Sequence, residues 1–148
     1  MATQSTARAV WQGDLRGGKG TVSTTSGILD EEEVTWAARV ERTADATSPE
    51  ELLAAAHAAC FAMALSHALA QDGSTAERLE VAATTSFDRV GEGYRVTSSN
   101  LVVRGHVPGI AEGRFAELAD EAGEGCPISQ ALAGNVEITV DASLSGGP

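Results

Sequence analysis

Two cysteines are the residues of this sequence best suited to chemistry, and they lie in contrasting surroundings. Cys60 lies in the middle of a long uncharged, alanine-rich stretch, Leu52 to Gln71. Cys126 lies between Gly125 and Pro127, at a point where a short helix should begin. A lone buried cysteine usually behaves as a small apolar residue. Two cysteines, one in a core helix and one at a helix start, instead suggest a dithiol that can close to a disulfide and open again.

The local surroundings of the two thiols favour Cys126 as the reactive one. Pro127 suits the first helical position, which makes Cys126 the N-cap, where a thiolate meets free N–H groups and the positive end of the helix dipole. Cys60 lies in mid-helix among alanines and Phe61, and burial alone would raise its pKa and leave it inert. From these residues, Cys126 is the expected nucleophile. Cys60 can take that role only if a cation from elsewhere lies beside it.

The element that must position Cys60 is a long helix beginning at Ser48. Ser48 is a good N-cap, Pro49 fits the first helical position, Glu51 completes a capping box with Ser48, and Gly73 is a plausible end. The residues expected to share one face are Leu53, Ala56, Cys60, Met63, Ala64 and His67. The stretch is about long enough to cross a bilayer. Because it also carries histidines, a serine and a glutamine, and its bulk is alanine, we interpret it as a buried central helix.

The rest of the sequence predicts strands and shorter helices around that helix. Alternating or β-prone segments predict strands over 7–12, 20–25, 34–41, 79–88, 94–106 and 136–144. Helical spacing predicts helices over 115–122 and 126–132, while the acidic run 30–33 is expected in a solvated loop or strand edge. The order βββ-α-ββ-αα-β predicts an α+β fold, with antiparallel sheets packed around the central helix.

Composition sets the class of protein and excludes some partners. The 148 residues suit a single domain, 1–148, with a real core. Lys and Arg number 10 against 21 Asp and Glu, a net charge of −11, which argues against nucleic acid or an anionic membrane as a partner. The first residues, Met1 to Gln12, show no signal-peptide pattern. Two cysteines without such a signal indicate a reducing cytoplasm, where disulfides are usually transient or catalytic.

Both cysteine segments resemble the motifs of a known family. The segment Ser48 to Leu65 is similar to the first cysteine motif of the OsmC/Ohr family of thiol peroxidases, and Gly125 to Gln130 is similar to the second. Near the N-terminus, Trp11 to Leu15 and Gly18 to Val22 resemble the osmotically inducible branch rather than the organic hydroperoxide resistance branch. The resemblance extends over essentially the whole chain.

The resemblance implies a peroxidase that reduces organic hydroperoxides, and hydrogen peroxide to a branch-dependent extent, through a cysteine pair. It implies that Cys60 is the peroxidatic cysteine and Cys126 the resolving one, which reverses the choice made from local surroundings. The family's arginine matches Arg39 and its glutamate matches Glu50. Arg39 would supply the cation that Cys60 lacks, and its guanidinium could also pair with Glu50.

The expected reaction needs no cofactor. The Cys60 thiolate attacks a peroxide oxygen and becomes a sulfenic acid, with which Cys126 condenses to a disulfide. A dithiol reductant from outside then reduces the pair. No segment of the sequence indicates a site for flavin, haem or a nucleotide.

His57 leaves alternatives open. It lies one turn before Cys60, so a Cys-His pair could make a cysteine hydrolase. With Cys60 and Cys126 it could instead be part of a zinc or small-molecule binding site. It could also be a helix histidine satisfied by packing or solvent. The large apolar residues expected in the core are Trp11, Trp36, Phe61, Met63 and Phe115, of which Phe61 and Met63 could line a pocket for a hydroperoxide.

The helix geometry predicts that the active site needs two subunits. Glu50 and Cys60 lie ten residues apart on one predicted helix, which is roughly 15 Å along the axis. No glutamate side chain closes that gap. We therefore expect a two-fold homodimer in which antiparallel copies of the helix cross and Glu50 of one chain approaches Cys60 of the other. The resemblance, which implies an intertwined homodimer, favours the same arrangement.

Overall fold

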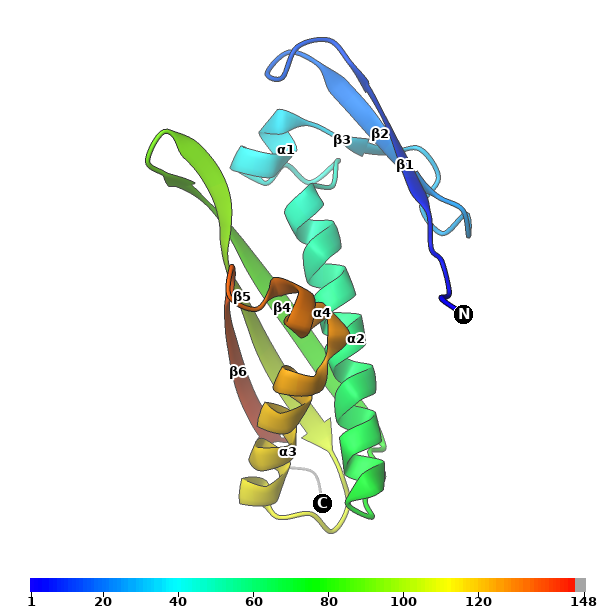
Figure 1. Cartoon of the computed structure of the whole chain (residues 1–148), viewed down its shortest axis with the longest axis vertical. Coiled ribbons are helices and arrows are strands. Elements are labelled where there is room, and N and C mark those ends of the chain that lie inside the picture. Colours follow the sequence, from blue (N-terminus) through cyan, green and yellow to red (C-terminus); the bar gives the residue numbers. More distant parts are fainter. Residues whose placement is uncertain (146–148) are drawn as a thin grey trace. The chain divides into compact units, whose positions relative to one another are not determined.

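The computed structural model describes residues 1–145, and the chain divides into two compact units (Figure 1). The first unit is Met1–Leu52 and the second begins at Leu53. Each unit contains a three-stranded sheet. The long helix α2, Pro49–Gln71, begins in the first unit and continues into the second.

The first unit is built on an antiparallel sheet with the strand order β1-β2-β3. Its strands are β1 (Ala7–Gln12), β2 (Lys19–Thr24) and β3 (Glu32–Val34). The two N-terminal strands predicted from the sequence are thus confirmed. The acidic run ends in the short outer strand β3, in keeping with its expected place at a strand edge.

The strand predicted over 34–41 is wrong, because most of this segment forms helix α1, Trp36–Glu41. The Thr35 hydroxyl caps the helix by accepting a hydrogen bond from the Ala38 amide at 3.0 Å. Arg42 ends it in the left-handed conformation, with φ 59°. A threonine cap followed by two alanines favours a helix, and this local preference outweighs a weak alternation.

The start of α2 is capped as predicted. The Ser48 hydroxyl accepts a hydrogen bond from the Glu51 amide at 3.1 Å. The Glu51 carboxylate accepts a hydrogen bond from the Thr47 hydroxyl at 2.6 Å. The capping box would instead have it accept from the Ser48 amide. At the other end Gly73 has φ +85°, and the Ser74 amide donates to the Leu69 carbonyl at 2.8 Å. This is a glycine C-cap.

The second unit contains a long hairpin and a parallel third strand. Strands β4 (Arg78–Val90) and β5 (Gly93–His106) pair antiparallel. Strand β6 (Glu137–Leu144) pairs with β5 in parallel, so this sheet is not fully antiparallel as predicted. Helices α3 (Glu112–Gly125) and α4 (Pro127–Leu132) connect β5 to β6. A connection of this length returns the chain to the starting end of β5, which a parallel pair requires.

The core of the second unit lies between its sheet and helices α2 and α3, which run alongside it in Figure 1. Its centre is made of Phe61, Leu65 and Leu69 of α2, Leu101 and Val103 of β5, and Phe115, Leu118, Ala119 and Ala122 of α3. A Cβ at Gly105 would lie 2.5 Å from Cζ of Phe115. Glycine there allows the ring to lie directly against β5, and the α+β class is confirmed.

The buried side of α2 differs from the one predicted. His57, Phe61, Leu65 and Leu69 are fully buried, whereas Met63 is 69% exposed. His67 is exposed too, and so is Trp11, which was expected in the core. The helix is apolar around most of its circumference, so the spacing of its apolar residues could not show which side faces the core.

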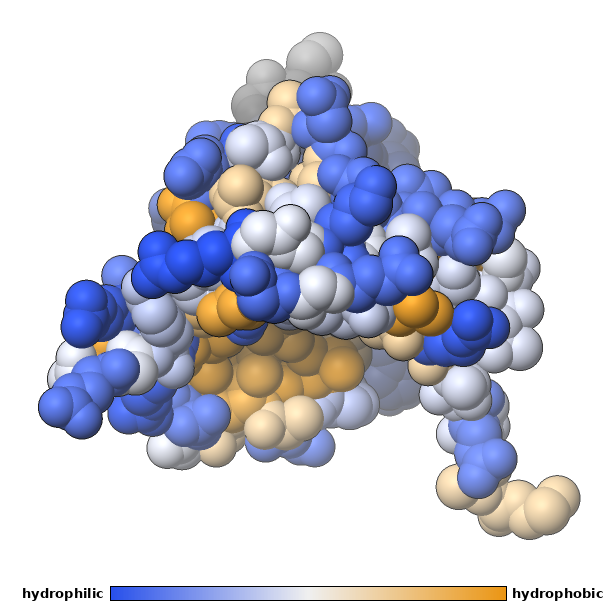
Figure 2. Space-filling model, turned by 90° about the horizontal axis from the view of Figure 1, so that it is seen from above, coloured by the Kyte–Doolittle hydropathy of each residue, from blue (hydrophilic) through white to orange (hydrophobic). Residues whose placement is uncertain are grey.

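An apolar side of α2 remains open in the single chain. By length and composition this helix could cross a membrane, yet only 22% of its most apolar window is buried. Ala55, Ala59 and Met63, spaced four residues apart, lie exposed along one stripe. Figure 2 shows hydrophobic side chains gathered in one area of the surface and bordered by hydrophilic ones. The full burial of α2 that the sequence predicts is therefore not seen in this chain.

Candidate active site

The two thiols, 66 residues apart in the sequence, lie side by side in the second unit. Their Sγ atoms are 3.0 Å apart. Both cysteines are free; Cys126 is completely buried and Cys60 is half-buried. Since a disulfide bond is about 2.05 Å long, the sulfurs need to approach by about another 1 Å to join. The dithiol predicted from the sequence is present.

Cys126 is held at the junction of two helices. Its amide donates to the Ala122 carbonyl at 2.8 Å, ending α3, and its carbonyl accepts from the Gln130 amide at 3.0 Å, starting α4. Pro127 occupies the first turn of α4, as predicted. Cys126 is therefore the N-cap residue of α4, although its side chain makes no cap hydrogen bond there.

The surroundings of the two sulfurs shift their pKa values in opposite directions. Burial raises the pKa of Cys60, and the hydrogen bond with Cys126 raises it further. Burial also acts to raise the pKa of Cys126, but the hydrogen bond with Cys60 acts against burial, and the net shift of that pKa is downward. Within this unit, Cys126 is the more acidic thiol, as its local sequence predicts.

His57 lies in the core and bonds to two serines. Its Nδ1 is 2.7 Å from the Ser99 hydroxyl and its Nε2 is 2.8 Å from the Ser129 hydroxyl. All three residues are buried, and burial lowers the pKa of His57. The imidazole is therefore neutral near pH 7. The sequence interpretation missed both serines; the one available signal was the position of Ser129, one helical turn after Cys126.

This geometry disfavours the alternatives based on His57. Both of its ring nitrogens are bonded to hydroxyl groups, so it makes neither a base for Cys60 nor a metal ligand with the two thiols. Among residues 1–145, no group of three histidine, cysteine or acidic side chains is placed to hold a metal ion. A helix histidine satisfied by packing is the interpretation that fits.

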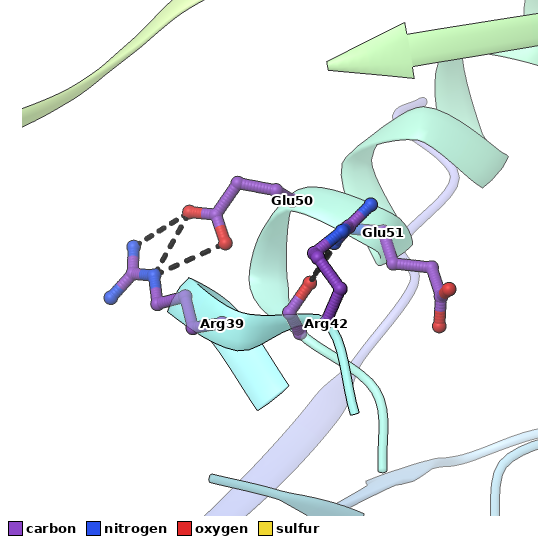
Figure 3. A network of polar contacts seen from close by, with 5 residues as sticks. Arg39, Arg42, Glu50 and Glu51 are labelled. Carbon is purple, nitrogen blue, oxygen red and sulfur yellow. Dashed lines mark hydrogen bonds and ion pairs between the residues drawn. The ribbon is translucent and has the colours of Figure 1, made fainter. Parts of the chain in front are cut away.

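The matched arginine and glutamate form an ion pair in the first unit (Figure 3). Arg39 Nε donates to both carboxylate oxygens of Glu50, at 3.0 and 3.1 Å, and Nη2 donates to Oε1 at 2.8 Å. The Glu50 side chain is 3% exposed and that of Arg39 31%. The neighbouring pair differs: Arg42 donates to the Ser48 hydroxyl at 3.4 Å, and Glu51 bonds to Thr47. The pair fixes the position of both charges, because a buried carboxylate needs its cation.

An apolar hollow of about 310 Å³ lies beside Arg39 in the first unit. Its lining residues are Trp11, Leu15, Val34, Thr35, Trp36, Arg39 and Pro49. The prediction that Phe61 and Met63 line a pocket is not met in the chain, since Phe61 is sealed in the core and Met63 lies on the surface. Two tryptophans, Trp11 and Trp36, instead supply the aromatic lining of the hollow beside Arg39.

A close pair of free thiols, one of them at a helix start in an α+β fold, defines a thiol redox protein. The model of the family described as OsmC-like protein matches residues 42–141. The chain belongs to this family.

Sequence and structure comparisons agree with that assignment. The chain is 42% identical to peroxiredoxin OsmC of Escherichia coli (strain K12), covering 97% of this chain and 99% of that protein. It is 33% identical to the organic hydroperoxide resistance protein OhrA of Bacillus subtilis (strain 168), over 70% of this chain and 72% of that one. The crystal structure of OhrB of Bacillus subtilis has a TM-score of 0.74 at 28% identity, covering 93% of this chain and 98% of that one. The fuller likeness to OsmC confirms the branch predicted from the N-terminal segments.

Proposed function

We propose that this protein is a cysteine-based peroxidase of the cytoplasm that reduces organic hydroperoxides, and hydrogen peroxide as well. The relatives named peroxiredoxin and organic hydroperoxide resistance protein support this activity. The observation that carries the proposal is the Sγ–Sγ distance of 3.0 Å between two free thiols. A pair this close can be oxidised to a disulfide with little movement. The whole chain acts as one peroxidase domain.

Cys60 is the thiol that meets the peroxide. It is half-buried, whereas Cys126 is completely buried, so a peroxide reaches Cys60 first. The lower pKa of Cys126 does not decide the order, because the two thiols are hydrogen-bonded to each other and a proton can pass between them. A cation beside Cys60 draws the negative charge onto that sulfur.

In the first step the Cys60 thiolate attacks the distal oxygen of the hydroperoxide. A sulfur–oxygen bond forms, the oxygen–oxygen bond breaks, and the alkoxide leaves with a proton from solvent as an alcohol. The sulfur is oxidised by two electrons to the sulfenic acid and the peroxide is reduced. Cys126 then attacks the sulfenic sulfur and expels hydroxide, which becomes water. A dithiol reductant restores both thiols by thiol–disulfide exchange.

Arg39 is the proposed cation, and Glu50 holds it. Three hydrogen bonds join the two side chains within one chain, so they act as a unit. Glu50 precedes Cys60 by ten residues on α2, a distance of roughly 15 Å along the helix axis. The pair therefore completes the site of a second copy in a homodimer. The exposed apolar stripe of α2 is the surface that such a copy would cover.

The hollow beside Arg39 favours an organic substrate. Two tryptophans and a leucine line it, so the alkyl or aryl group of a hydroperoxide can bind there while the peroxide oxygens face the guanidinium. Hydrogen peroxide lacks that group and gains nothing from the apolar surface. We therefore expect the organic substrate to react faster.

Stopped-flow oxidation tests this function. The reduced protein is mixed with an alkyl hydroperoxide or with hydrogen peroxide, and free thiols are counted at the end. We expect two thiols lost per chain, one alcohol formed per disulfide, and a larger rate constant with the alkyl hydroperoxide. Retention of both thiols in the presence of excess alkyl hydroperoxide would contradict the proposal.

A further inference from the structure

His57 joins three elements of the second unit through two buried hydrogen bonds. Its Nδ1 is 2.7 Å from the hydroxyl of Ser99 on β5, and its Nε2 is 2.8 Å from the hydroxyl of Ser129 on α4. The three residues are 0%, 0% and 3% exposed. Strand β5 has a neighbouring strand on each side, so the imidazole connects α4 to a well-held part of the sheet. The reaction described above makes no use of these three residues.

The bond between His57 and Ser129 lies one helical turn from the contact between the two thiols. His57 is three residues before Cys60 on α2, and Ser129 is three residues after Cys126. Residues three apart on a helix lie on the same side, one turn from each other. Two neighbouring contacts therefore join α2 to the start of α4, which lie side by side in Figure 1. One contact is between thiols and can become covalent, and the other is a fixed hydrogen bond.

We propose that His57 is a positioning residue for the dithiol, which holds Cys126 against Cys60 by bonding to Ser129. Ser99 holds the imidazole from the other side. The arrangement works with either tautomer, because a neutral imidazole donates from one nitrogen and accepts at the other, and a serine hydroxyl can do both. This inference rests on the proposed function only in taking Cys60 and Cys126 as the pair that forms a disulfide.

A directional contact is useful here because a disulfide has a strict geometry. The other fully buried side chains along this side of α2 are apolar: Phe61, Leu65 and Leu69. Apolar packing stabilises a core without fixing direction, whereas a hydrogen bond restricts both distance and angle. A buried imidazole is costly unless its nitrogens are bonded. Histidine at this position therefore fixes the place of α4 on α2 more closely than another apolar residue would.

The hydrogen bond matters most when the disulfide is absent. In the oxidised protein, the sulfur–sulfur bond itself joins α2 to the start of α4. In the reduced protein, only non-covalent contacts keep Cys126 beside Cys60. Without the bond from His57 to Ser129, Cys126 gains freedom of movement, and the effective concentration of one thiol at the other falls. The reduced form is then favoured, so the disulfide becomes easier to reduce.

The test measures the reduction potential of the Cys60–Cys126 pair in buffers set with glutathione or dithiothreitol. Reduction of the disulfide to two thiols takes two electrons and two protons from the buffer thiols, which are oxidised to their own disulfide. Ser129→Ala and His57→Asn should each shift this equilibrium about tenfold toward the reduced protein, which is a potential about 30 mV higher. An asparagine amide reaches the place of Nδ1, so His57→Asn keeps the contact with Ser99 and loses the one with Ser129.

Conservative variants should restore the original potential. His57→Gln places its amide near the position of Nε2 and keeps a hydrogen bond to Ser129. Ser129→Thr keeps the hydroxyl on α4. His67→Asn, which removes an exposed histidine from the same helix, is the matched control and should leave the potential unchanged.

Leu69→Ala separates positioning from a general loss of stability. Leu69 is fully buried in the same core, but it is nine residues after Cys60, roughly 14 Å along the helix axis. The variant leaves a cavity, so its midpoint of urea unfolding should fall. Its reduction potential should stay at the wild-type value, because the contact between α2 and α4 is intact.

Three results would overturn the proposal. The first is a wild-type potential in both Ser129→Ala and His57→Asn. The second is a shift of equal size in Leu69→Ala, and the third is an equal shift in His57→Gln and His57→Asn. The experiment uses no peroxide, so these failures are distinct from a failure of the proposed peroxidase activity.

Discussion

The dithiol centre and the Arg39–Glu50 pair differ in their chemistry. The first is made of two free thiols, and the second is an ion pair. Cys60 and Cys126 contact each other and the apolar side chains in the core of the second unit. The other centre, in the first unit, is a full ion pair whose carboxylate is 3% exposed. One centre holds two free thiols, and the other holds fixed charge.

This difference is the reason why the proposed mechanism uses both centres. Without a cation, burial raises the pKa of Cys60, and the hydrogen bond with Cys60 lowers the pKa of Cys126. The thiol that a peroxide can reach is thus the less acidic one. In the proposed mechanism, a guanidinium beside Cys60 would reverse that order, and Glu50 would hold the guanidinium in place.

The largest effect is expected from removing one thiol at a time. Cys60→Ser should abolish turnover, whereas Cys126→Ser should allow one reduction event and leave a sulfenic acid on Cys60. Mass spectrometry after one equivalent of alkyl hydroperoxide, with a sulfenic-acid trap, locates the added oxygen. If Cys126 were oxidised at the normal rate in Cys60→Ser protein, the choice of Cys126 from its local surroundings would be the right one.

The next effect is expected from Arg39→Ala. Loss of the cation should raise the pKa of Cys60 and slow its reaction with peroxide by on the order of 100-fold, because burial then acts unopposed. Stopped-flow rates measured across pH give both quantities. Arg42→Ala, which removes a neighbouring arginine bonded to Ser48, is the matched control and should keep the normal rate. An unchanged pH profile in Arg39→Ala would show that Arg39 does not affect the reaction of Cys60 with peroxide.

A change on the open side of α2 tests the second copy. Met63 is 69% exposed, and Met63→Glu would place a charge in the proposed contact between helices. Sedimentation should show dissociation of the proposed homodimer, and activity should fall with it. An unpaired charge buried in that contact would destabilise the dimer by about 3 kcal/mol. Ile28→Glu, at a residue 83% exposed in the first unit, is the control. A wild-type protein that sediments as a monomer would rule out this assembly.

The smallest effect concerns stability and the buried histidine. The folded-state pKa of His57 lies below its ordinary value of 6.5, so below pH 6.5 the unfolded chain binds the proton more readily than the folded one. The free energy of unfolding should therefore fall with decreasing pH, by about 1.4 kcal/mol per pH unit, until the folded pKa is reached. Urea unfolding of wild type and His57→Phe should show this slope in the difference between them. If the free energy of unfolding changed equally with pH in both proteins, His57 would not contribute to the pH dependence of stability.

Local signals predicted the helix and strand starts well. Ser48 and Pro49 defined the beginning of α2, and Pro127 placed Cys126 at the start of α4. Two features of the fold were not predicted. The segment 34–41 alternates only weakly, and its threonine cap decided for a helix. The parallel pairing of β6 with β5 depends on the path of α3 and α4, which no local pattern encodes.

The site was predictable only in part, for a similar reason. The thiol pair and the Arg39–Glu50 match came from the motifs, and the single-chain ion pair agrees with the match. The hydrogen bonds of His57 could not be foreseen, because Ser99 and Ser129 lie 42 and 72 residues from it and serines are common. The side of α2 that faces the core could not be foreseen either, since alanine surrounds the helix.

The most direct test of cooperation between the two centres is a mixing experiment. Cys60→Ser chains and Glu50→Ala chains, each inactive alone, are denatured and refolded together in equal amounts. If the ion pair of one copy completes the dithiol centre of the other, heterodimers regain one intact site, and the mixture should reach about one quarter of wild-type activity. Mixing Glu50→Ala with the Cys60→Ser, Glu50→Ala double variant is the control, which should stay inactive. No recovery in the first mixture would contradict a site shared between copies.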